Sequence, residues 1–476
     1  MKHLWRKIVS VILALAMVVL CLPEYVRPVK TAMAADITTT MDSNGNVTYY
    51  DASGTQHTIA RSEYTLVNSG SNSTTSWRTG TYVIASAERA YGSANSGYTS
   101  TIRFSGRIDI SGDVKLIVLD SVRVRLNGSV NTYVNAKNYL NATAGINVQA
   151  GSSLTIYGSQ DENTAGRITV SGNSNSAGIG GRANSSCGTI MIEGGYVSGT
   201  GNGGGAGIGA GKGGTGGKVV IKGGYVKGSG GNGSSNASGG AGIGGANTEV
   251  TITGGKISAT GNGGGAGIGG SYNENGGAIT ISNGDVTANG NYGGAGIGGG
   301  SNGNGGSVTI SGGSVTANGG TYGAGIGGGY HAYGGTITIS GASTRVTATG
   351  GSYAAGIGGG CADSTGVSTI QNIGIEGGTV TAIGGSGACG IGSGEGQDAL
   401  GKITISGGTV DATAGGYDTY NFTSNYTAAI GGSFADSDKI TISGGNVTTH
   451  LPENKIDQIE QKISCKDRDS HLQINC

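Results

Sequence analysis

Three tyrosines occupy matching places in consecutive copies of a repeated sequence, and they are the side chains best suited to bind a ligand. Tyr292, Tyr322 and Tyr353 each lie four or five residues before the Ile of an Ala-Gly-Ile-Gly motif. If the repeats stack in register, the three rings form an exposed aromatic strip, on which sugar rings can stack through their apolar C–H faces. The strip predicts carbohydrate binding, although loop tyrosines can also serve only to cover backbone. Three more tyrosines are expected in the opposite loop: Tyr272, Tyr330 and Tyr333.

Two pairs of carboxylates are the other candidates for chemistry. Glu395 and Asp398 share one Gly-rich loop, and Asp436 and Asp438 share the corresponding loop of the next repeat. Paired acids can hold a cation or perform acid/base catalysis, as polysaccharide lyases and hydrolases require. The other acids of the repeats are scattered, and acids on loops are usually just solvated. We therefore predict no catalytic residue and no metal ligand, and we expect the lone repeat histidine, His331, at the surface.

The repeat that positions these residues has a spacing of about 29 residues, seen from Val250 to Ile279, Val308 and Ile337. A spacing of about 20–50 residues indicates a solenoid or a propeller. Apolar-x-apolar triplets begin at Ile168, Ile190, Val219, Val250, Ile279, Val308, Ile337, Ile373, Ile403 and Ile440. A second Ile, expected at a corner, recurs at Ile179, Ile208, Ile243, Ile268, Ile297, Ile326, Ile357, Ile391 and Ile430.

Apolar and polar residues alternate inside each unit, which is typical of strands with one buried face. No window within the repeats has helical spacing, which excludes helix-containing repeats, and a propeller blade would need longer strands. We therefore predict an all-β fold, a right-handed parallel β-helix with about 29 residues per coil. The side chains expected to point inward from one coil are Ile279, Ile281, Val286, Ala288, Ala295 and Ile297.

The first 34 residues have the pattern of a secretory signal peptide. A basic head precedes an apolar run at residues 8–22, and Ala32-Met33-Ala34 provides a small-residue cleavage site. The run is short for a membrane span, so we expect no membrane span in the mature chain. The protein is predicted to be secreted, either extracellular or loosely associated with the cell surface.

The two ends of a solenoid need caps, because the end coils expose apolar rungs and unpaired strand edges. Residues 35–100 are expected to form an N-terminal β cap, residues 101–449 the parallel β-helix, and residues 450–476 a C-terminal tail or cap. Within that tail Ile456, Ile459 and Ile463 are spaced as on one face of a helix, which predicts a short helical cap.

Composition limits the partners. The chain has 28 basic and 28 acidic residues, and this zero net charge argues against a nucleic-acid partner.

No Cys-x-x-Cys pair occurs among the six cysteines, so neither a zinc site nor a small disulfide scaffold is predicted. Cys389 replaces an Ala of the repeat and is expected to be a small buried residue. No cofactor is predicted.

Three stretches carry a resemblance to a known family. GDVKLIVLD at residues 112–120, AGINVQAGSSLTIYG at residues 144–158 and the serial AGIGGG and TITISGG units resemble secreted Gly-rich β-helix proteins of clostridia-like Gram-positive bacteria. Some of these proteins are described as carbohydrate-binding-domain-containing surface proteins. The resemblance covers roughly residues 77–450 and implies fold and secretion, but it supplies no functional motif. Such proteins often carry a wall-anchoring module after the β-helix, and we expect none in residues 450–476.

Together these patterns predict a non-enzymatic protein that binds an extracellular polysaccharide or another glycan of host or bacterial origin. A polysaccharide lyase or hydrolase is the main alternative, and a self-associating structural rod is another. Outward hydroxyls such as Thr280, Ser282, Thr309 and Ser311 also form an array of the kind found on ice-binding β-helices. Threonine is a good strand former on any solvated face, so this array alone indicates little.

Overall fold

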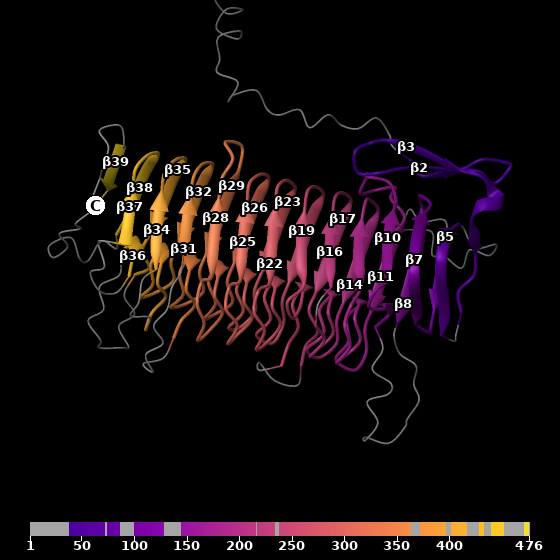
Figure 1. Cartoon of the computed structure of the whole chain (residues 1–476), viewed down its shortest axis with the longest axis horizontal. Coiled ribbons are helices and arrows are strands. Elements are labelled where there is room, and N and C mark those ends of the chain that lie inside the picture. The colour runs from indigo at the N-terminus through magenta and orange to yellow at the C-terminus, as the bar shows by residue number, and fades with distance from the viewer. Residues whose placement is uncertain are drawn as a thin grey trace, which may run out of the picture. The chain divides into compact units, whose positions relative to one another are not determined.

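Parallel strands stacked coil upon coil form the main body of the described part of the chain (Figure 1). The computed structural model describes residues 38–71, 74–85, 100–127, 144–215, 217–233, 238–362, 372–396, 401–416, 428–432, 439–451 and 471–475. All of them belong to the unit Thr38–Cys476. A typical coil contains β22 (Ala278–Ile281), β23 (Asp285–Asn289) and β24 (Ile297–Gly298). Each of these three strands forms a parallel ladder with the strand that lies 29 residues further along the chain. The paired residues include Ile279↔Val308, Val286↔Val315 and Ile297↔Ile326.

The coils therefore build three ladders, named here the first, second and corner ladders. The first ladder contains β10 (Ser153–Tyr157), β13 (Thr189–Ile192), β16 (Lys218–Ile221), β19 (Glu249–Ile252), β22, β25 (Ser307–Ile310), β28 (Thr336–Ile339), β31 (Asn372–Ile375), β34 (Lys402–Ile405) and β37 (Ile440–Ile442). The second ladder contains β6 (Ser100–Phe104), β8 (Val122–Asn127), β11 (Arg167–Ser171), β14 (Tyr196–Thr200), β17 (Tyr225–Ser229), β20 (Lys256–Thr260), β23, β26 (Ser314–Asn318), β29 (Arg345–Thr349), β32 (Thr379–Ile383), β35 (Thr409–Thr413), β38 (Asn446–His450) and β39 (His471–Asn475). The corner ladder contains β9 (Ile146–Val148), β12 (Ile179–Gly180), β15 (Ile208–Gly209), β18 (Ile243–Gly244), β21 (Ile268–Gly269), β24, β27 (Ile326–Gly327), β30 (Ile357–Gly358), β33 (Ile391–Gly392) and β36 (Ile430–Gly431).

The predicted right-handed parallel β-helix is confirmed, and so is the inward set of side chains. The six predicted side chains of one coil are all at most 1% exposed: Ile279, Ile281, Val286, Ala288, Ala295 and Ile297. Because each ladder pairs like with like, these residues form continuous Ile, Val and Ala columns along the solenoid axis. Burial of these columns is the main stabilising term, at ~25 cal/mol for each Å² of apolar surface removed from water.

One strand assignment from the sequence was wrong. Ile168 was placed in the series of the first ladder, but it lies in β11 and pairs with Val197 of the second ladder. The first-ladder partner of Ile190 is Leu154. Both kinds of strand show the same apolar-x-apolar alternation, so periodicity alone cannot distinguish them where the connecting loop changes length.

The solenoid begins earlier than residue 101, the boundary expected from the sequence. β4 (Thr65–Val67) pairs in parallel with β5 (Thr75–Ile84), and β5 pairs with β7 (Ile108–Val118). The long strand β7 runs through two faces, because its start pairs with corner strand β9 and its end with β10. The corner and first ladders therefore join into one 23-stranded sheet, while the second ladder is a separate 13-stranded sheet.

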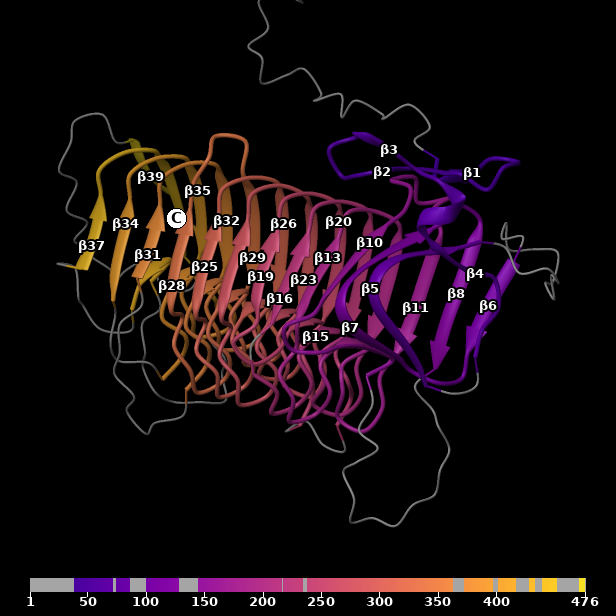
Figure 2. The same cartoon turned by 45° about the vertical axis from the view of Figure 1, so that its right-hand side comes forward.

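A small antiparallel sheet precedes the coils. It contains β1 (Thr40–Met41), β2 (Val47–Tyr50) and β3 (Gln56–Ile59), followed by the 3-10 helix η2 (Arg61–Glu63). A turn at Asn44-Gly45 joins β1 to β2, and Gly45 takes a φ of 82° there. This sheet docks against the side of the early coils, where the Tyr49 ring lies 5.0 Å from the Tyr157 ring (Figure 2).

At the other end, β39 pairs in parallel with β38 and extends the second ladder by one strand. The predicted short helix around Ile456, Ile459 and Ile463 lies outside the described residues, as does the predicted signal peptide. Among the described residues, no helix has the length and apolar character needed to cross a membrane.

Candidate functional site

Two Gly-rich loops meet at the corner ladder, because all its strands after β9 are only two residues long. In one coil the first loop runs over residues 290–296 and the second over 299–306. The backbone N–H of Ala295 donates to the carbonyl of Gly299 at 2.9 Å, which closes the turn around β24. The second loop of each coil also bonds to the first loop of the previous coil. Ser301 N–H donates to the Gly264 carbonyl at 2.7 Å, and in the next coil Tyr330 N–H donates to the Gly293 carbonyl at 2.7 Å. First and second loops of successive coils are therefore interleaved on one side of the solenoid.

The three predicted tyrosines are brought together at this corner. The Tyr292 and Tyr322 ring centroids are 5.5 Å apart in an edge-to-face arrangement, and the Tyr322 and Tyr353 centroids are 6.3 Å apart with nearly parallel rings. All three side chains are half-buried. Tyr322 N–H also donates to the Tyr292 carbonyl at 2.9 Å, so backbone pairing fixes the register of the strip. We call Tyr292, Tyr322, Tyr330 and Tyr353 the corner tyrosines.

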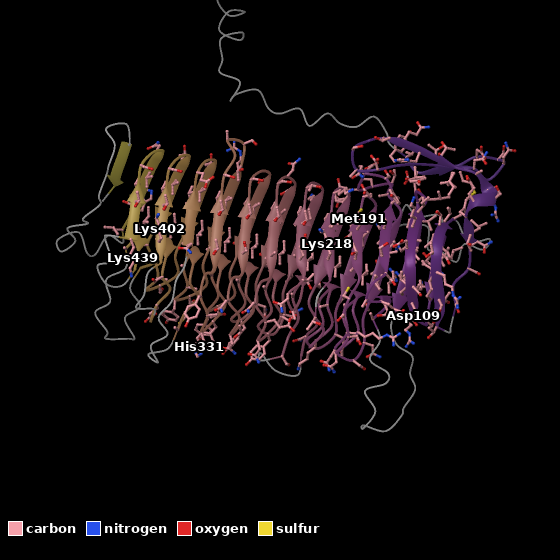
Figure 3. The ribbon with its side chains drawn as sticks, in the orientation of Figure 1. Asp109, Met191, Lys218, His331, Lys402 and Lys439 are labelled. Atoms are coloured by element: carbon pink, nitrogen blue, oxygen red, sulfur yellow. The ribbon has the colours of Figure 1, made fainter. Side chains whose placement is uncertain are left out.

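Tyr330 lies in the second loop, as expected from the sequence, but its ring contacts the strip of the first loops. Its ring centroid lies 5.0 Å from that of Tyr322, so the second loop contributes a fourth ring. The reason is the interleaving of the loops, which the sequence spacing does not reveal. His331 follows it, is half-buried rather than freely exposed, and lies with its ring 3.7 Å from that of Tyr330. Figure 3 shows His331 among these Gly-rich loops.

Two of the corner tyrosines have an unfavourable backbone conformation. Tyr292 and Tyr353 adopt φ values of 51° and 70°, in the left-handed region that favours Gly and Asn. The corresponding places before the corner Ile in other coils are held by such residues: Asn175, Gly203, Gly263 and Gly387. A left-handed conformation costs roughly 1–2 kcal/mol for a residue with a side chain. The left-handed backbone at these two positions therefore disfavours tyrosine, and some other requirement must explain why tyrosine is present.

The carboxylate pairs are largely outside the described residues. Asp398, Asp436 and Asp438 lie in segments that the structure does not describe. Glu395 is described, and its N–H donates to the Tyr353 carbonyl at 2.9 Å. In the described part of the chain, no group of three or more His, Cys, Asp or Glu side chains is arranged to hold a metal ion.

The buried cysteines are not nucleophiles. Cys389 is 1% exposed, as expected for a substitute of Ala, and burial raises the pKa of its thiol to about 11. Burial likewise raises the pKa of Cys187 to about 12. Both thiols therefore stay protonated at neutral pH, and a protonated thiol is a poor nucleophile.

The outward hydroxyl array on the first ladder is interrupted. Thr251, Thr280, Thr309 and Thr338 follow one another in register, but Gly374 takes the next place before Thr404. Lysines also stand on this face at Lys218 and Lys402 (Figure 3). The face is therefore not the unbroken hydroxyl grid that ice binding would need.

A second aromatic surface was missed by sequence reasoning. Tyr196 and Tyr225 are paired in register on the outward side of the second ladder, far in sequence from the corner tyrosines. A hollow of about 300 Å³ lies over them. The sequence does contain a pattern that predicts this pairing, because Gly-Gly-Tyr-Val occurs twice with a spacing of 29 residues. It was overlooked because the first strand residue after the Gly-Gly turn varies in the later coils.

Six segments of the chain match the family model of the β-helix repeat: residues 250–272, 279–301, 308–330, 337–361, 373–395 and 403–434. Each segment starts at a first-ladder strand and extends through the corner. The chain is a parallel β-helix protein. The corner tyrosines all lie within matched repeats of this protein, whereas Tyr196 and Tyr225 precede the first of them. No curated protein and no solved structure matches the chain.

Proposed function

We propose that this β-helix protein is a non-enzymatic carbohydrate-binding protein that uses the corner tyrosines as its sugar platform. The observation that carries the proposal is the backbone of Tyr292 and Tyr353. Both rings stand where Gly or Asn would be the less costly choice, and strained residues of this kind cluster at functional sites. Their rings join those of Tyr322 and Tyr330 into one contiguous aromatic surface.

The surface suits a neutral sugar. Aromatic rings offer apolar faces to the C–H faces of a pyranose, while the phenolic O–H groups provide hydrogen bonds at the rim. Asn302 N–H donates to the Tyr330 carbonyl at 2.7 Å, and the Asn302 side chain donates to that of Asn273 at 2.8 Å, so amide groups adjoin the platform. In this proposal the leader at residues 1–34 directs the protein out of the cell, where an extracellular polysaccharide or host glycan is the ligand.

A glycan array probed with the full chain tests this function. We expect binding to neutral glycans, and we expect Tyr292→Gly and Tyr353→Gly each to weaken it because each removes one ring without straining the backbone. Tyr50→Thr is the matched control, since Tyr50 lies on β2 and hydrogen-bonds Gln56 away from the corner. Neutral-glycan binding that survives both corner variants together would overturn the proposal.

A further inference from the structure

Two columns of outward side chains run along the early part of the second ladder. One column follows the register Thr101, Arg123, Arg167, Tyr196, Tyr225, Lys256 and Asp285. The neighbouring column follows Arg103, Arg125, Thr169, Ser198, Lys227 and Ser258. Figure 2 brings β6, β8 and β11, where these columns begin, to the front. We call this surface, from β6 to β20, the basic face.

The two tyrosines of the basic face are each associated with a cation. The guanidinium of Arg167 lies 4.3 Å from the Tyr196 ring centroid, and the Lys256 ammonium lies 5.9 Å from the Tyr225 ring centroid. These contacts hold the long side chains beside the rings and lower the entropy lost when a ligand arrives. Tyr196, Tyr225, Lys227 and Lys256 all line the hollow described above.

Positive charge is concentrated on this face although the chain as a whole is neutral. The two columns carry six cations: Arg103, Arg123, Arg125, Arg167, Lys227 and Lys256. Two carboxylates, Glu162 and Asp285, border the hollow, and Glu162 lies 3.8 Å from the Lys256 ammonium. Four arginines lie on β6, β8 and β11, beyond the hollow in the direction of the N-terminus.

We propose that the basic face binds an anionic polysaccharide whose acidic groups meet the arginines and whose sugar rings enter the hollow. Guanidinium groups pair with carboxylates or sulfates through two parallel hydrogen bonds, which makes arginine better suited than lysine to this role. Parallel strands are ~4.8 Å apart, so a polymer lying along the axis meets a new pair of side chains at each coil. This site is separate from the corner tyrosines and needs a different ligand. An experiment can therefore contradict one of the two binding proposals and leave the other intact.

The test measures binding of the full chain to polygalacturonate at several salt concentrations. We expect binding that weakens as salt rises, and we expect the double variant Arg125→Gln/Lys227→Gln to weaken it roughly tenfold. Both side chains are exposed, so folding should be preserved, and a far-UV spectrum checks this. Tyr225→Thr should also weaken binding, because it removes one wall of the hollow while keeping a good strand former.

Three comparisons make the result decisive. Lys402→Gln removes a cation from the first ladder and should leave binding unchanged, and methyl-esterified polygalacturonate, which has lost its charge, should bind poorly. Equal losses for Lys402→Gln and the double variant, or no binding to polygalacturonate, would overturn the proposal. Single-stranded oligothymidylate bound as tightly as polygalacturonate would also overturn it, because the face would then recognise charge without sugar.

Discussion

The backbone N–H of Ala52 donates a hydrogen bond to Oε2 of Glu193 at 3.2 Å, across 141 residues of sequence. The other oxygen of this carboxylate accepts a bond from the Lys222 ammonium at 2.8 Å. Glu193 itself is buried, although Lys222 is partly exposed. One carboxylate thus joins the N-terminal antiparallel sheet to two coils of the solenoid.

Glu193→Gln should loosen this junction. The amide keeps the shape but removes the charge, and we expect a loss of about 1–2 kcal/mol in the free energy of unfolding. Hydrogen exchange of β2 and β3 should accelerate more than that of the coils. The matched control is Glu249→Gln, which breaks the exposed Glu249–Lys218 pair and should cost less than about 0.5 kcal/mol. Equal effects of the two variants would show that Glu193 does not anchor the sheet.

Asp109 should make the first coils sensitive to acid. Burial by itself raises the pKa of Asp109, but hydrogen bonds from Asn147, Arg182 and Arg107 together lower it below its usual value. A lowered folded-state pKa contributes stability that is present above about pH 4 and is lost as the pH falls through that pKa. Asp109→Asn should therefore cost about 2 kcal/mol at pH 7, and the difference from the wild type should be smaller at pH 3. Denaturant titrations at both pH values measure this, and a pH-independent difference would contradict it.

Asp120 should have the opposite pH dependence. Burial raises the pKa of its carboxyl to about 7, while Thr39 N–H donates to it at 3.2 Å. A carboxyl whose pKa is raised on folding contributes stability at low pH, and this contribution declines between about pH 4 and pH 7. Asp120→Asn should therefore stabilise the protein at pH 8, by about 1–2 kcal/mol because solvent screens a partly exposed group. At pH 4 the variant and the wild type should be equally stable, and a gain of the same size at both pH values would refute the mechanism.

Much of this structure follows from the repeat in the sequence, and the exceptions have physical reasons. The columns through Ile279 and Ile297 were predictable, because alternation within a strand and a constant spacing between strands leave one way to stack the coils. The contact of Tyr330 with Tyr322 was not, since it depends on how two Gly-rich loops interleave around a two-residue strand. The pairing of Tyr196 with Tyr225 was readable from their spacing, but its significance depends on cations from other strands.

The corner glycines should tolerate no side chain. Gly298 has a φ of 133°, and a Cβ there would collide with the carbonyl oxygen of Gly327 in the next coil. Gly298→Ala should therefore cost about 3 kcal/mol or more, through backbone strain together with the collision. Gly151→Ala is the control, because Gly151 has a φ of 75° but no atom within 4 Å of the added Cβ. It should cost only about 1 kcal/mol, and similar losses for the two variants in chemical denaturation would show that packing between the coils is not limiting.

Substitutions of two corner tyrosines, Tyr292 and Tyr322, should affect protein stability and glycan binding differently. Tyr292→Gly relieves a left-handed residue, a gain of about 1 kcal/mol, and loses one edge-to-face ring contact, a loss of about 1 kcal/mol. Its net effect on the free energy of unfolding should therefore be close to zero. Tyr322→Ala relieves no such strain and loses contacts with three rings, so it should cost about 1–2 kcal/mol.

Chemical denaturation and glycan binding, measured on the same two variants, check this expectation. Both variants should bind neutral glycans more weakly, although only Tyr322→Ala should be less stable. If Tyr292→Gly were as destabilising as Tyr322→Ala and bound glycans normally, the rings would serve to cover the loops. Retained stability with lost binding would instead mean that Tyr292 is kept at a strained position for its ligand, which is the behaviour expected of a binding residue.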